Sequence, residues 1–289
     1  MRSLAAAAAA GEFAVMGIVN VTPDSFSDGG LYLDAEAAVQ HGRELEAAGA
    51  AILDVGGEST RPGALPVAQA DELDRVVPVI EGLRASGSGA LISIDTSKAP
   101  VAAAALRAGA TLVNDVTALR GDPGMAEIVA GAEADCCLMH MLGEPRTMQK
   151  DPRYEDVVSE VKAFLERRMT FAVSRGIAEE RILLDPGIGF GKTTEHNLEL
   201  LGRLGELLTL GRPIVIGTSR KSFLGRITAR PVRDRVAATI ATNVLAYERG
   251  ARVFRVHDAG PIHDALAITA ATVQRQWAST TATTTSSTT

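Results

Sequence analysis

The feature that most constrains the fold is a regular alternation between short apolar runs and segments with helical spacing. Eight runs rich in Val, Ile and Leu occupy residues 13–19, 50–55, 90–94, 110–113, 135–139, 181–184, 212–217 and 251–256. Each run is apolar along most of its length, which is typical of parallel strands covered on both faces. Eight strand–helix units in 289 residues predict an α/β fold, a single (β/α)8 TIM barrel with its active site at the C-terminal ends of the strands. The pattern alone is also compatible with one alternative fold, an open, doubly wound sheet.

Two of the segments between the runs carry clear helix signals. The Ala-rich segment 34–50 begins at Asp34, a residue type favoured at N-caps, and Gly49 is a typical stop. The segment 154–176 ends at Gly176 and has Arg167, Arg168 and Arg175 near its C-terminal end, where the helix dipole favours cations. We therefore expect a helix over each segment.

The two ends of the chain differ in composition from the region between them. Residues 1–12 are Ala-rich and residues 277–289 are rich in Ser and Thr. Neither end can bury enough apolar surface to order itself, so we expect both to be disordered. For the start, a disordered lead is favoured over a signal peptide because the Ala run is only weakly apolar. Residues 13–276 are then one barrel domain.

The overall charge and the cysteines narrow the class of partner. A net charge of −6 gives no reason to expect nucleic acid or an anionic membrane, and no stretch is long and apolar enough for a membrane span. The only two cysteines, Cys136 and Cys137, are adjacent in an apolar run, which fits buried thiols in a reducing compartment. We therefore expect a cytoplasmic protein that acts on small molecules.

Polar side chains gather directly after the apolar runs. In run order, these are Asn20, the segment 56–64, Asp95, Asn114, Met139 with His140, Asp185 with the segment 186–192, the segment 218–222, and Arg255 with His257. In a barrel, all of these positions meet at the C-terminal face, where barrel enzymes place their sites. Few such polar residues precede the runs, and this difference between the two ends of the strands predicts an active site at the C-terminal face.

One group of rim residues consists of acids and amides. Asp95, Asn114 and Asp185, with Lys221 nearby, suit a flat heterocycle that offers several N–H donors and a carbonyl. A carboxylate can accept two parallel N–H bonds, and a lysine can satisfy a ring nitrogen or oxygen. The alternative is that Asp95 and Asp185 only cap the helices that follow them.

A second group of rim residues is cationic. Arg61, Arg220, Arg255 and His257 fit a clamp for phosphate or diphosphate oxygens. Arg255 and His257 are two positions apart, so on a strand they lie on the same face. The alternative for each arginine is an ion pair with an acid such as Asp24, Asp28, Glu58 or Asp258.

Eight motifs in these regions resemble a known family. In chain order, "MGIVNVTPDSFSDGG", "DVGGESTRPGA", "SIDTSK", "VNDV", "LMHMLGEPRTMQ", "LDPGIGFGKT", "GTSRKSFLG" and "RVHD" resemble the motifs of the dihydropteroate synthases, in family order over residues 15–270. The resemblance implies an enzyme of folate synthesis that joins 6-hydroxymethyl-7,8-dihydropterin diphosphate to p-aminobenzoate, with Mg2+. Family members commonly form homodimers, which we carry over as an expectation.

The resemblance also implies a role for each matching residue. The pterin would be held by Asp95, Asn114, Asp185 and Lys221, with Met139 and Phe190 lining its pocket. The diphosphate would be held by Asn20, Arg61, Arg255 and His257, with Asn20 also a Mg2+ ligand. The p-aminobenzoate site would be shaped by Phe26, Thr60, Pro62, Ser219, Arg220 and Lys221. Within these sets, Asn20, Asp95, Asp185, Lys221, Arg255 and His257 would carry the catalysis.

This chemistry predicts a dissociative substitution. The bond that breaks joins carbon to a diphosphate oxygen, so the main task is to stabilise negative charge on the leaving group. The arylamine is neutral at pH 7, so no strong general base is required. The polar segment from Asn20 to Gly30 is then a lid that keeps water from the cationic centre. The residues around the p-aminobenzoate site follow the family pattern, which favours a sulfonamide-sensitive enzyme.

Two other functions share parts of this pattern. A pterin-binding methyltransferase would use the same acid–amide pocket, but it releases no diphosphate and would not need Arg61, Arg255 and His257 together. A catalytically silent pterin-binding paralogue would be expected to lose the clamp or the lid, and both are intact. Without the resemblance, the pattern indicates a phosphate-binding barrel enzyme of sugar metabolism.

Overall fold

The computed structural model describes residues 12–21, 31–60 and 63–274. It contains eight parallel strands in a ring: β1 (Ala14–Asn20), β2 (Ile52–Gly56), β3 (Leu91–Asp95), β4 (Leu112–Asp115), β5 (Asp135–Met139), β6 (Ile182–Asp185), β7 (Val215–Ile216) and β8 (Val253–Val256). The hydrogen-bonded order is β6-β5-β4-β3-β2-β1-β8-β7. A parallel bridge between Leu184 and Ile214 joins β6 to the segment that enters β7. The ring is therefore a barrel, and the open sheet is excluded.

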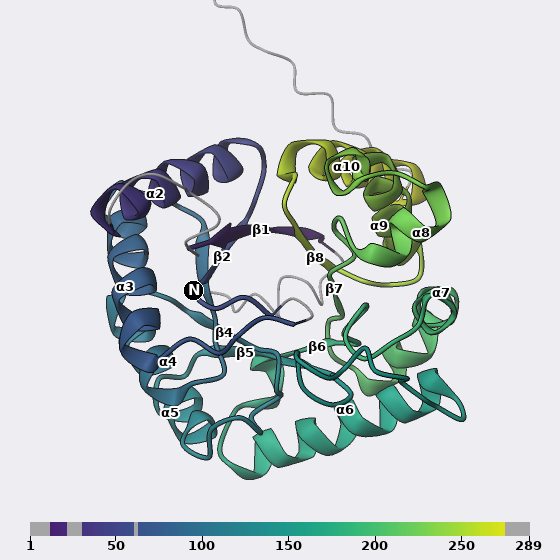
Figure 1. The fold of residues 1–289 in the computed structure, drawn as a ribbon, viewed down its shortest axis with the longest axis horizontal. Coiled ribbons are helices and arrows are strands. Elements are labelled where there is room, and N and C mark those ends of the chain that lie inside the picture. Colours follow the sequence, from purple (N-terminus) through teal and green to yellow (C-terminus); the bar gives the residue numbers. More distant parts are fainter. Residues whose placement is uncertain (1–11, 22–30, 61–62, 275–289) are drawn as a thin grey trace, which may run out of the picture.

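The helices surround this ring (Figure 1). They are α2 (Leu31–Ala47), α3 (Gln69–Ala85), α4 (Ala99–Ala108), α5 (Met125–Gly131), α6 (Val157–Ser174), α7 (Thr194–Gly202), α8 (Ser222–Thr228), α9 (Val236–Glu248) and α10 (Ala259–Gln274). Three short 3-10 helices, η1 (Glu179–Arg181), η2 (Leu204–Leu210) and η3 (Val232–Asp234), lie between them. The predicted (β/α)8 architecture is confirmed. Among the described helices, none is long and apolar enough to cross a membrane.

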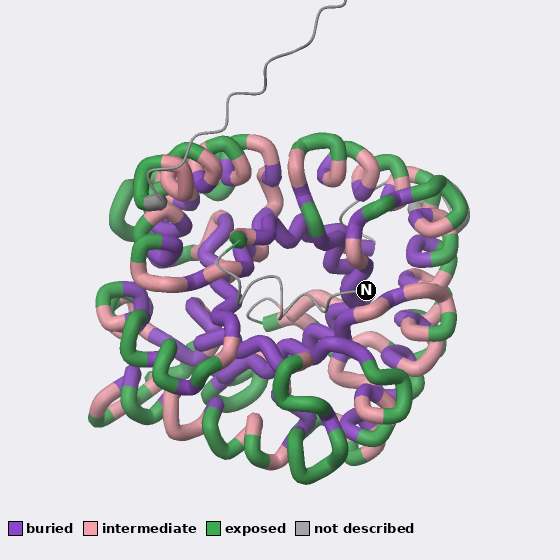
Figure 2. The backbone as a smooth tube through the Cα atoms, turned by 180° about the vertical axis from the view of Figure 1, so that it is seen from behind, coloured by how far each residue is buried: buried purple, intermediate pink, exposed green. Residues whose placement is uncertain are grey.

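Period-two alternation along the strands divides the core into two parts. Val15 and Val19 of β1 face outward and belong to the large cluster under the helices. The side chains that alternate with them fill the barrel floor, which consists of Ala14, Met16, Ile52, Leu112, Cys137, Leu183, Val215 and Val253. Figure 2 shows this buried ring at the centre of the molecule, with the exposed residues at its edge. Each fully buried aliphatic side chain contributes about 1.5–3 kcal/mol of transfer free energy. Farther along the strands, the same parity turns polar side chains inward.

The helix ends match one part of the sequence prediction and correct another. Helix α2 begins at Leu31, so the prediction that Asp34 is its N-cap is wrong. The helix dipole favours acidic residues throughout the first turn, so the presence of an Asp does not by itself identify the N-cap position. The predicted stops are confirmed, because Gly49 and Gly176 follow α2 and α6 with φ of 96° and 91°.

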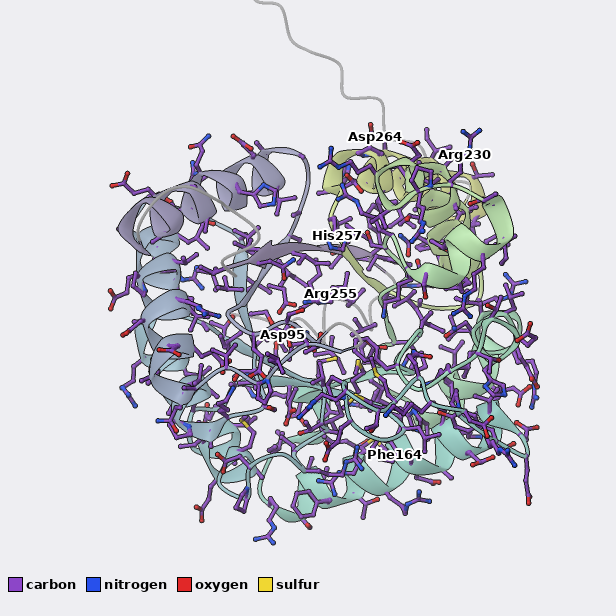
Figure 3. All side chains as sticks on the ribbon, in the orientation of Figure 1. Asp95, Phe164, Arg230, Arg255, His257 and Asp264 are labelled. Carbon is purple, nitrogen blue, oxygen red and sulfur yellow. The ribbon has the colours of Figure 1, made fainter. Side chains whose placement is uncertain are left out.

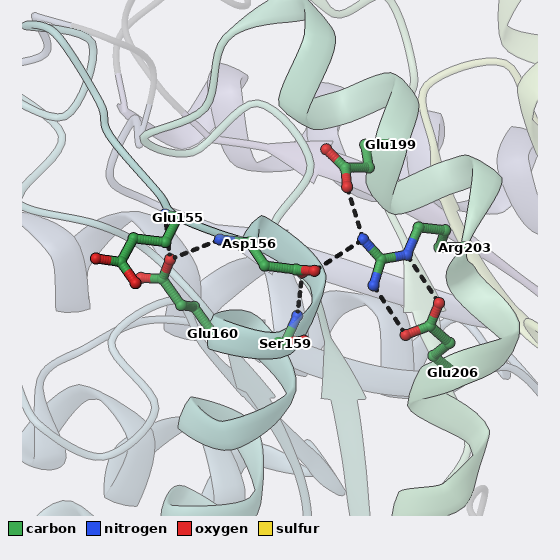
Figure 4. A network of polar contacts seen from close by, with 7 residues as sticks. All are labelled: Glu155, Asp156, Ser159, Glu160, Glu199, Arg203 and Glu206. Carbon is green, nitrogen blue, oxygen red and sulfur yellow. Dashed lines mark hydrogen bonds and ion pairs between the residues drawn. The ribbon is translucent and has the colours of Figure 1, made fainter.

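The start of α6 is held by a polar network that also reaches α7 and η2 (Figure 4). The Asp156 side chain accepts a hydrogen bond from the backbone N of Ser159 (2.8 Å), as an N-cap does. Its other oxygen pairs with Arg203 at 3.1 Å, and Arg203 also contacts Glu199 and Glu206. All of these groups are largely solvated, so the network fixes geometry more than it adds stability.

Candidate active site

A pocket opens at the C-terminal ends of the strands, with an empty volume of about 440 Å³ that includes its mouth. Its lining is drawn from most of the barrel: Ile18, Thr60, Asp95, Asn114, Val116, Met139, Asp185, Phe190, Gly217, Ser219, Lys221, Arg255 and His257. Asp95, Arg255 and His257 lie toward the centre of the ring, whereas Arg230 and Asp264 lie at its outer edge (Figure 3). Ten of the residues singled out in the sequence therefore meet at one cavity.

The barrel register explains why these residues meet. Asp95 is the last residue of β3 and pairs in register with Asn114 of β4. Asp185 is the last residue of β6 and pairs with Met139 of β5. Because parallel strands all present their carboxyl ends to one side, residues distant in sequence become neighbours there.

Arg255 is the centre of the polar network. Its Nε lies 2.6 Å from Oδ2 of Asp54, and its Nη2 lies 2.7 Å from Oδ2 of Asp95. Asn114 donates from Nδ2 to the same Asp54 oxygen at 3.2 Å. Burial alone would lower the pKa of Arg255, but the two carboxylates outweigh it and raise the pKa, so the guanidinium is always charged.

The carboxyl groups of the pocket are harder to ionise than in water. Burial raises the pKa of Asp95 to about 7, with Arg255 opposing and the nearby Asp54 carboxylate adding to the rise. Burial also raises the pKa of Asp185, against a hydrogen bond from the backbone N of Gly187 (2.7 Å) and the positive charge of Lys221. Asp95 therefore exchanges its proton near neutral pH.

Lys221 is the lysine of the pocket lining. Its Nζ donates to the backbone O of Ile188 and lies 4.1 Å from the centroid of the Phe190 ring. Burial lowers the pKa of Lys221 to about 7, although Asp185 acts in the opposite direction. The amine is thus poised between charged and neutral forms beside an aromatic face.

The segment 186–192 after β6 is held rigidly against the pocket. Gly187, Gly189 and Gly191 have φ of 67°, 82° and 63°, a region that favours glycine. A Cβ on Gly187 would lie 1.9 Å from the backbone O of His140. The carbonyls of this segment accept from side chains of other parts of the chain: Gln149 binds Gly189 O at 2.7 Å, and Tyr154 binds Gly191 O at 2.8 Å. Asp185 and Phe190 are fixed in place as a result.

The cationic residues do not all behave alike. The Oγ of Ser219 lies 3.0 Å from the ring Nδ1 of His257 and 3.1 Å from its backbone N. Ser219 and His257 both line the pocket. Arg220 pairs instead with Asp258, with Nε and Oδ2 2.9 Å apart, and it does not line the pocket. For Arg220, the ion pair left open by the sequence is the arrangement observed.

Some of the expected site residues lie at the margin of the pocket or outside the described residues. Asn20 ends β1 in register with Gly56, just beyond the pocket lining. Phe26, Arg61 and Pro62 lie outside the described residues, as does most of the proposed lid.

The capping alternative for the two aspartates is not what the structure shows. Helix α4, which follows β3, begins after Lys98, and the backbone N of Ala99 is bonded by Asp122. Helix α7, which follows β6, is capped by Thr193. Neither Asp95 nor Asp185 caps the helix that follows it, and both line the pocket.

A second cavity adjoins the first and shares Thr60, Asp95 and Val116 with it. Its empty volume is about 750 Å³, and it extends toward the segment after β5, as far as Arg146. Glu58 and Glu72 line this cavity, and the Lys98 ammonium bridges their carboxylates. Among the described residues, no group of three or more His, Cys, Asp or Glu is arranged to hold a metal ion.

The sequence analysis missed one residue of this region and one contact. Asp54 lies inside an apolar run, but it has the same parity as the inward-facing Ile52, which was a usable signal. His140 and Lys192 were placed at the rim, but their contact was not predicted: both side chains are buried, with Nζ and Nδ1 2.9 Å apart. Their burial had no signal in residue spacing.

Comparison with known proteins places the chain in a family. The family model described as pterin binding enzyme matches residues 16–257. The dihydropteroate synthase of Escherichia coli K12 is 44% identical over 90% of this chain and 91% of its own. That of Mycobacterium leprae is 48% identical over 89% of this chain and 92% of its own.

Solved structures agree with these relatives. The Yersinia pestis dihydropteroate synthase in a sulfonamide drug complex superposes with a TM-score of 0.86 at 44% identity, over 91% of this chain and 95% of its own. The Xanthomonas albilineans enzyme with 4-aminobenzoic acid gives 0.85 at 48% identity, over 91% and 93%. The same enzyme with 7,8-dihydropteroate gives 0.82 at 46% identity, over 91% and 94%. With this fold, this pocket and this identity over nine-tenths of its length, the chain belongs to the pterin-binding enzyme family, among the dihydropteroate synthases.

Proposed function

We propose that this chain condenses 6-hydroxymethyl-7,8-dihydropterin diphosphate with p-aminobenzoate to give 7,8-dihydropteroate and diphosphate. The observation that carries the proposal is the meeting of Asp95, Asn114, Asp185 and Lys221 around one pocket that also contains Arg255 and His257. An acid–amide pocket beside cations matches a substrate that has a hydrogen-bonding heterocycle at one end and a diphosphate at the other.

The pterin ring would lie in the inner part of the pocket. Asp185 and Asn114 would accept its N–H groups, and Lys221 would donate to a ring nitrogen or oxygen. Met139 and Phe190, which also line the pocket, would cover the ring faces. Asp95 would be the further acceptor, since its carboxylate is available above about pH 7.

The diphosphate would lie on the cationic side. Arg255 uses Nε and Nη2 for its two aspartates, so its Nη1 retains two N–H donors for phosphate oxygens. His257 would add a donor from the same strand end, and Asn20 and Arg61 would complete the clamp. Charge on the departing oxygen is the main barrier, so these donors would provide most of the catalysis.

A Mg2+ ion fits the donors present. Mg2+ prefers oxygen ligands, keeps several waters and is commonly held by few protein groups together with substrate phosphates. Asn20, at the end of β1, offers an amide oxygen, and the described residues contain no cluster that would hold a metal without substrate. When bound, the ion would neutralise charge on the leaving diphosphate.

The substitution would proceed by carbon–oxygen cleavage ahead of carbon–nitrogen bond formation. The electron pair of the C–O bond leaves with the diphosphate, and the methylene cation is conjugated with the pterin. The p-aminobenzoate nitrogen then forms the C–N bond and releases one proton. Asp95 and Asp185 would favour the cation electrostatically, and neither has to act as a strong base.

The p-aminobenzoate site would lie toward the mouth of the pocket. Thr60, Ser219 and Lys221 are among the residues that line the cavity, and Phe26, Pro62 and Arg220 would complete the site. The segment from Asn20 to Gly30 would close over both substrates and keep water from the cation.

The test is to incubate the purified protein with the pterin diphosphate and Mg2+, with and without p-aminobenzoate. Diphosphate release that requires p-aminobenzoate and matches dihydropteroate formation supports the synthase. Pterin binding without release would instead indicate a silent paralogue, and methyl transfer from a folate donor would indicate the methyltransferase.

We also propose that the enzyme acts as a homodimer in the cytoplasm, as expected from the family. Light scattering on the purified protein tests the assembly, and a monomer at micromolar concentration would contradict it.

A further inference from the structure

A fully buried carboxylate lies behind the pocket without lining it. Asp54 of β2 has no exposed surface, and the pocket lining includes its neighbours but not Asp54 itself. It contacts two lining residues through one oxygen: Oδ2 accepts from Arg255 Nε at 2.6 Å and from Asn114 Nδ2 at 3.2 Å. A single atom thus joins a residue of the pterin set to a residue of the diphosphate set.

The other oxygen of Asp54 shows that this position is not optimised for stability. Asp54 Oδ1 is buried and has no hydrogen-bond partner among the described residues. Ser93, which pairs with Asp54 in register, is also buried with an unpartnered Oγ. A buried carboxylate that is only partly hydrogen-bonded destabilises a fold, whereas Ile52, which shares its parity on the same strand, packs into the apolar floor.

Charge balance alone does not account for Asp54. Arg255 already has a carboxylate partner in Asp95, at 2.7 Å. The negative charge of Asp54 also makes Asp95 harder to ionise, because it contributes to the rise in the pKa of Asp95. The second acid must therefore serve another purpose than neutralising Arg255.

The contact with Asn114 supplies that purpose. An ionised carboxylate can only accept hydrogen bonds, so it can face only the NH2 side of an amide. With Nδ2 bound to Asp54, the Oδ1 of Asn114 remains as the acceptor that this pocket residue offers to a ligand N–H. Without Asp54, the amide could rotate and offer a donor instead.

We propose that Asp54 is a positioning residue that fixes the amide orientation of Asn114 and the guanidinium plane of Arg255 together. The proposal rests on the proposed function, in which Asn114 holds the pterin and Arg255 holds the diphosphate. Because both contacts end on one oxygen, the two halves of the substrate are oriented by the same group.

The test compares Asp54→Asn with the matched control Ser93→Ala. Ser93 is the register neighbour on β3, is equally buried, and its Oγ forms no hydrogen bond to Asn114 or Arg255 or to any other described residue. Calorimetry measures the affinity for 6-hydroxymethyl-7,8-dihydropterin and, separately, for inorganic diphosphate with Mg2+, alongside steady-state kinetics. Asp54→Ser, which removes the charge and leaves room for water, is measured in the same way if the Asn variant does not fold.

We expect Asp54→Asn to weaken both affinities by about tenfold, which is about 1.4 kcal/mol each, and to raise KM for the pterin diphosphate. In an Asn114→Ala background, Asp54→Asn should lower the affinity for the pterin less than about threefold, because the contact between Asp54 and Asn114 is already absent. Ser93→Ala should keep both affinities within about twofold of wild type.

Two results would overturn the proposal. One is unchanged affinity for both ligands in Asp54→Asn, and the other is a lower kcat with unchanged KM and affinities, as expected from a smaller folded fraction. Both leave the proposed function standing as long as the wild-type protein forms dihydropteroate. A wild-type protein without that activity would contradict the proposed function instead.

Discussion

Lys192 Nζ and His140 Nδ1 lie 2.9 Å apart, and both side chains are almost completely buried. The Lys192 amine also donates to the backbone O of Phe190 at 3.0 Å. Burial lowers the pKa of His140 to about 2, with the positive charge of Lys192 adding to the effect. His140 is therefore neutral in the folded protein at any physiological pH.

This pair predicts a loss of stability in mild acid. Below the pKa of about 6.5 of an unfolded histidine, the unfolded chain binds a proton that the folded chain does not, so stability falls as the pH falls. Through His140, the free energy of unfolding should fall by about 1.4 kcal/mol between high pH and one pH unit below that pKa. Urea unfolding across this range should show the loss in wild type, and His140→Gln, which keeps an acceptor for Lys192, should lack that part of it. An equal loss in the variant would mean that His140 is charged or exposed in solution.

Gly187 and Gly211 form a matched pair for testing the rigid segment after β6. Both have positive φ, 67° and 71°, but a Cβ on Gly187 would lie 1.9 Å from His140 O while one on Gly211 would meet nothing within 4 Å. Gly211→Ala should therefore cost only the backbone strain, about 1–2 kcal/mol, and keep activity. Gly187→Ala should cost about 3 kcal/mol or more and lose most pterin affinity, because Asp185 must shift. Equal unfolding midpoints for the two variants would refute the close approach.

The two groups with a pKa of about 7 predict a narrow pH profile. If Asp95 accepts as a carboxylate and Lys221 donates as an ammonium, kcat/KM rises with pH as Asp95 ionises and falls as Lys221 loses its proton. The optimum should lie near pH 7. Asp95→Asn should lose the rising limb and Lys221→Gln the falling limb, each with lower activity overall. A profile of unchanged shape in both variants would assign the titration to other groups.

Sulfonamide inhibition tests the p-aminobenzoate site. The residues expected there follow the family pattern, and we predict an enzyme that is sensitive and is inhibited in competition with p-aminobenzoate. Raising p-aminobenzoate should restore the rate, whereas raising the pterin diphosphate should not. Inhibition that p-aminobenzoate fails to relieve would place the drug elsewhere, and the absence of inhibition would make the sensitivity prediction wrong.

The sequence predicted the fold and the rim because one physical rule governs both. Parallel strands present their carboxyl ends together, so Asp95, Asn114, Asp185 and Arg255 could be assigned to one site from their positions after apolar runs. The identity of the substrates did not follow from spacing. It came from the resemblance to known motifs, and the comparisons with relatives agree with it.

What the sequence could not provide was pairing across the barrel. Asp54 was overlooked because it lies within an apolar run, and its partner Arg255 is 201 residues away. The pairing of Arg220 with Asp258, 38 residues apart, had been an open alternative that only the fold could decide. Contacts of this kind depend on barrel geometry, which residue spacing does not encode.

The most direct test of the central claim is the affinity of 6-hydroxymethyl-7,8-dihydropterin for wild type and for Asp185→Asn, measured by calorimetry at neutral pH. The substitution keeps the shape of the side chain but replaces a carboxyl group with an amide, so we predict a loss of at least about tenfold in affinity. Equal affinity in the two proteins would contradict the assignment of the pterin to this pocket.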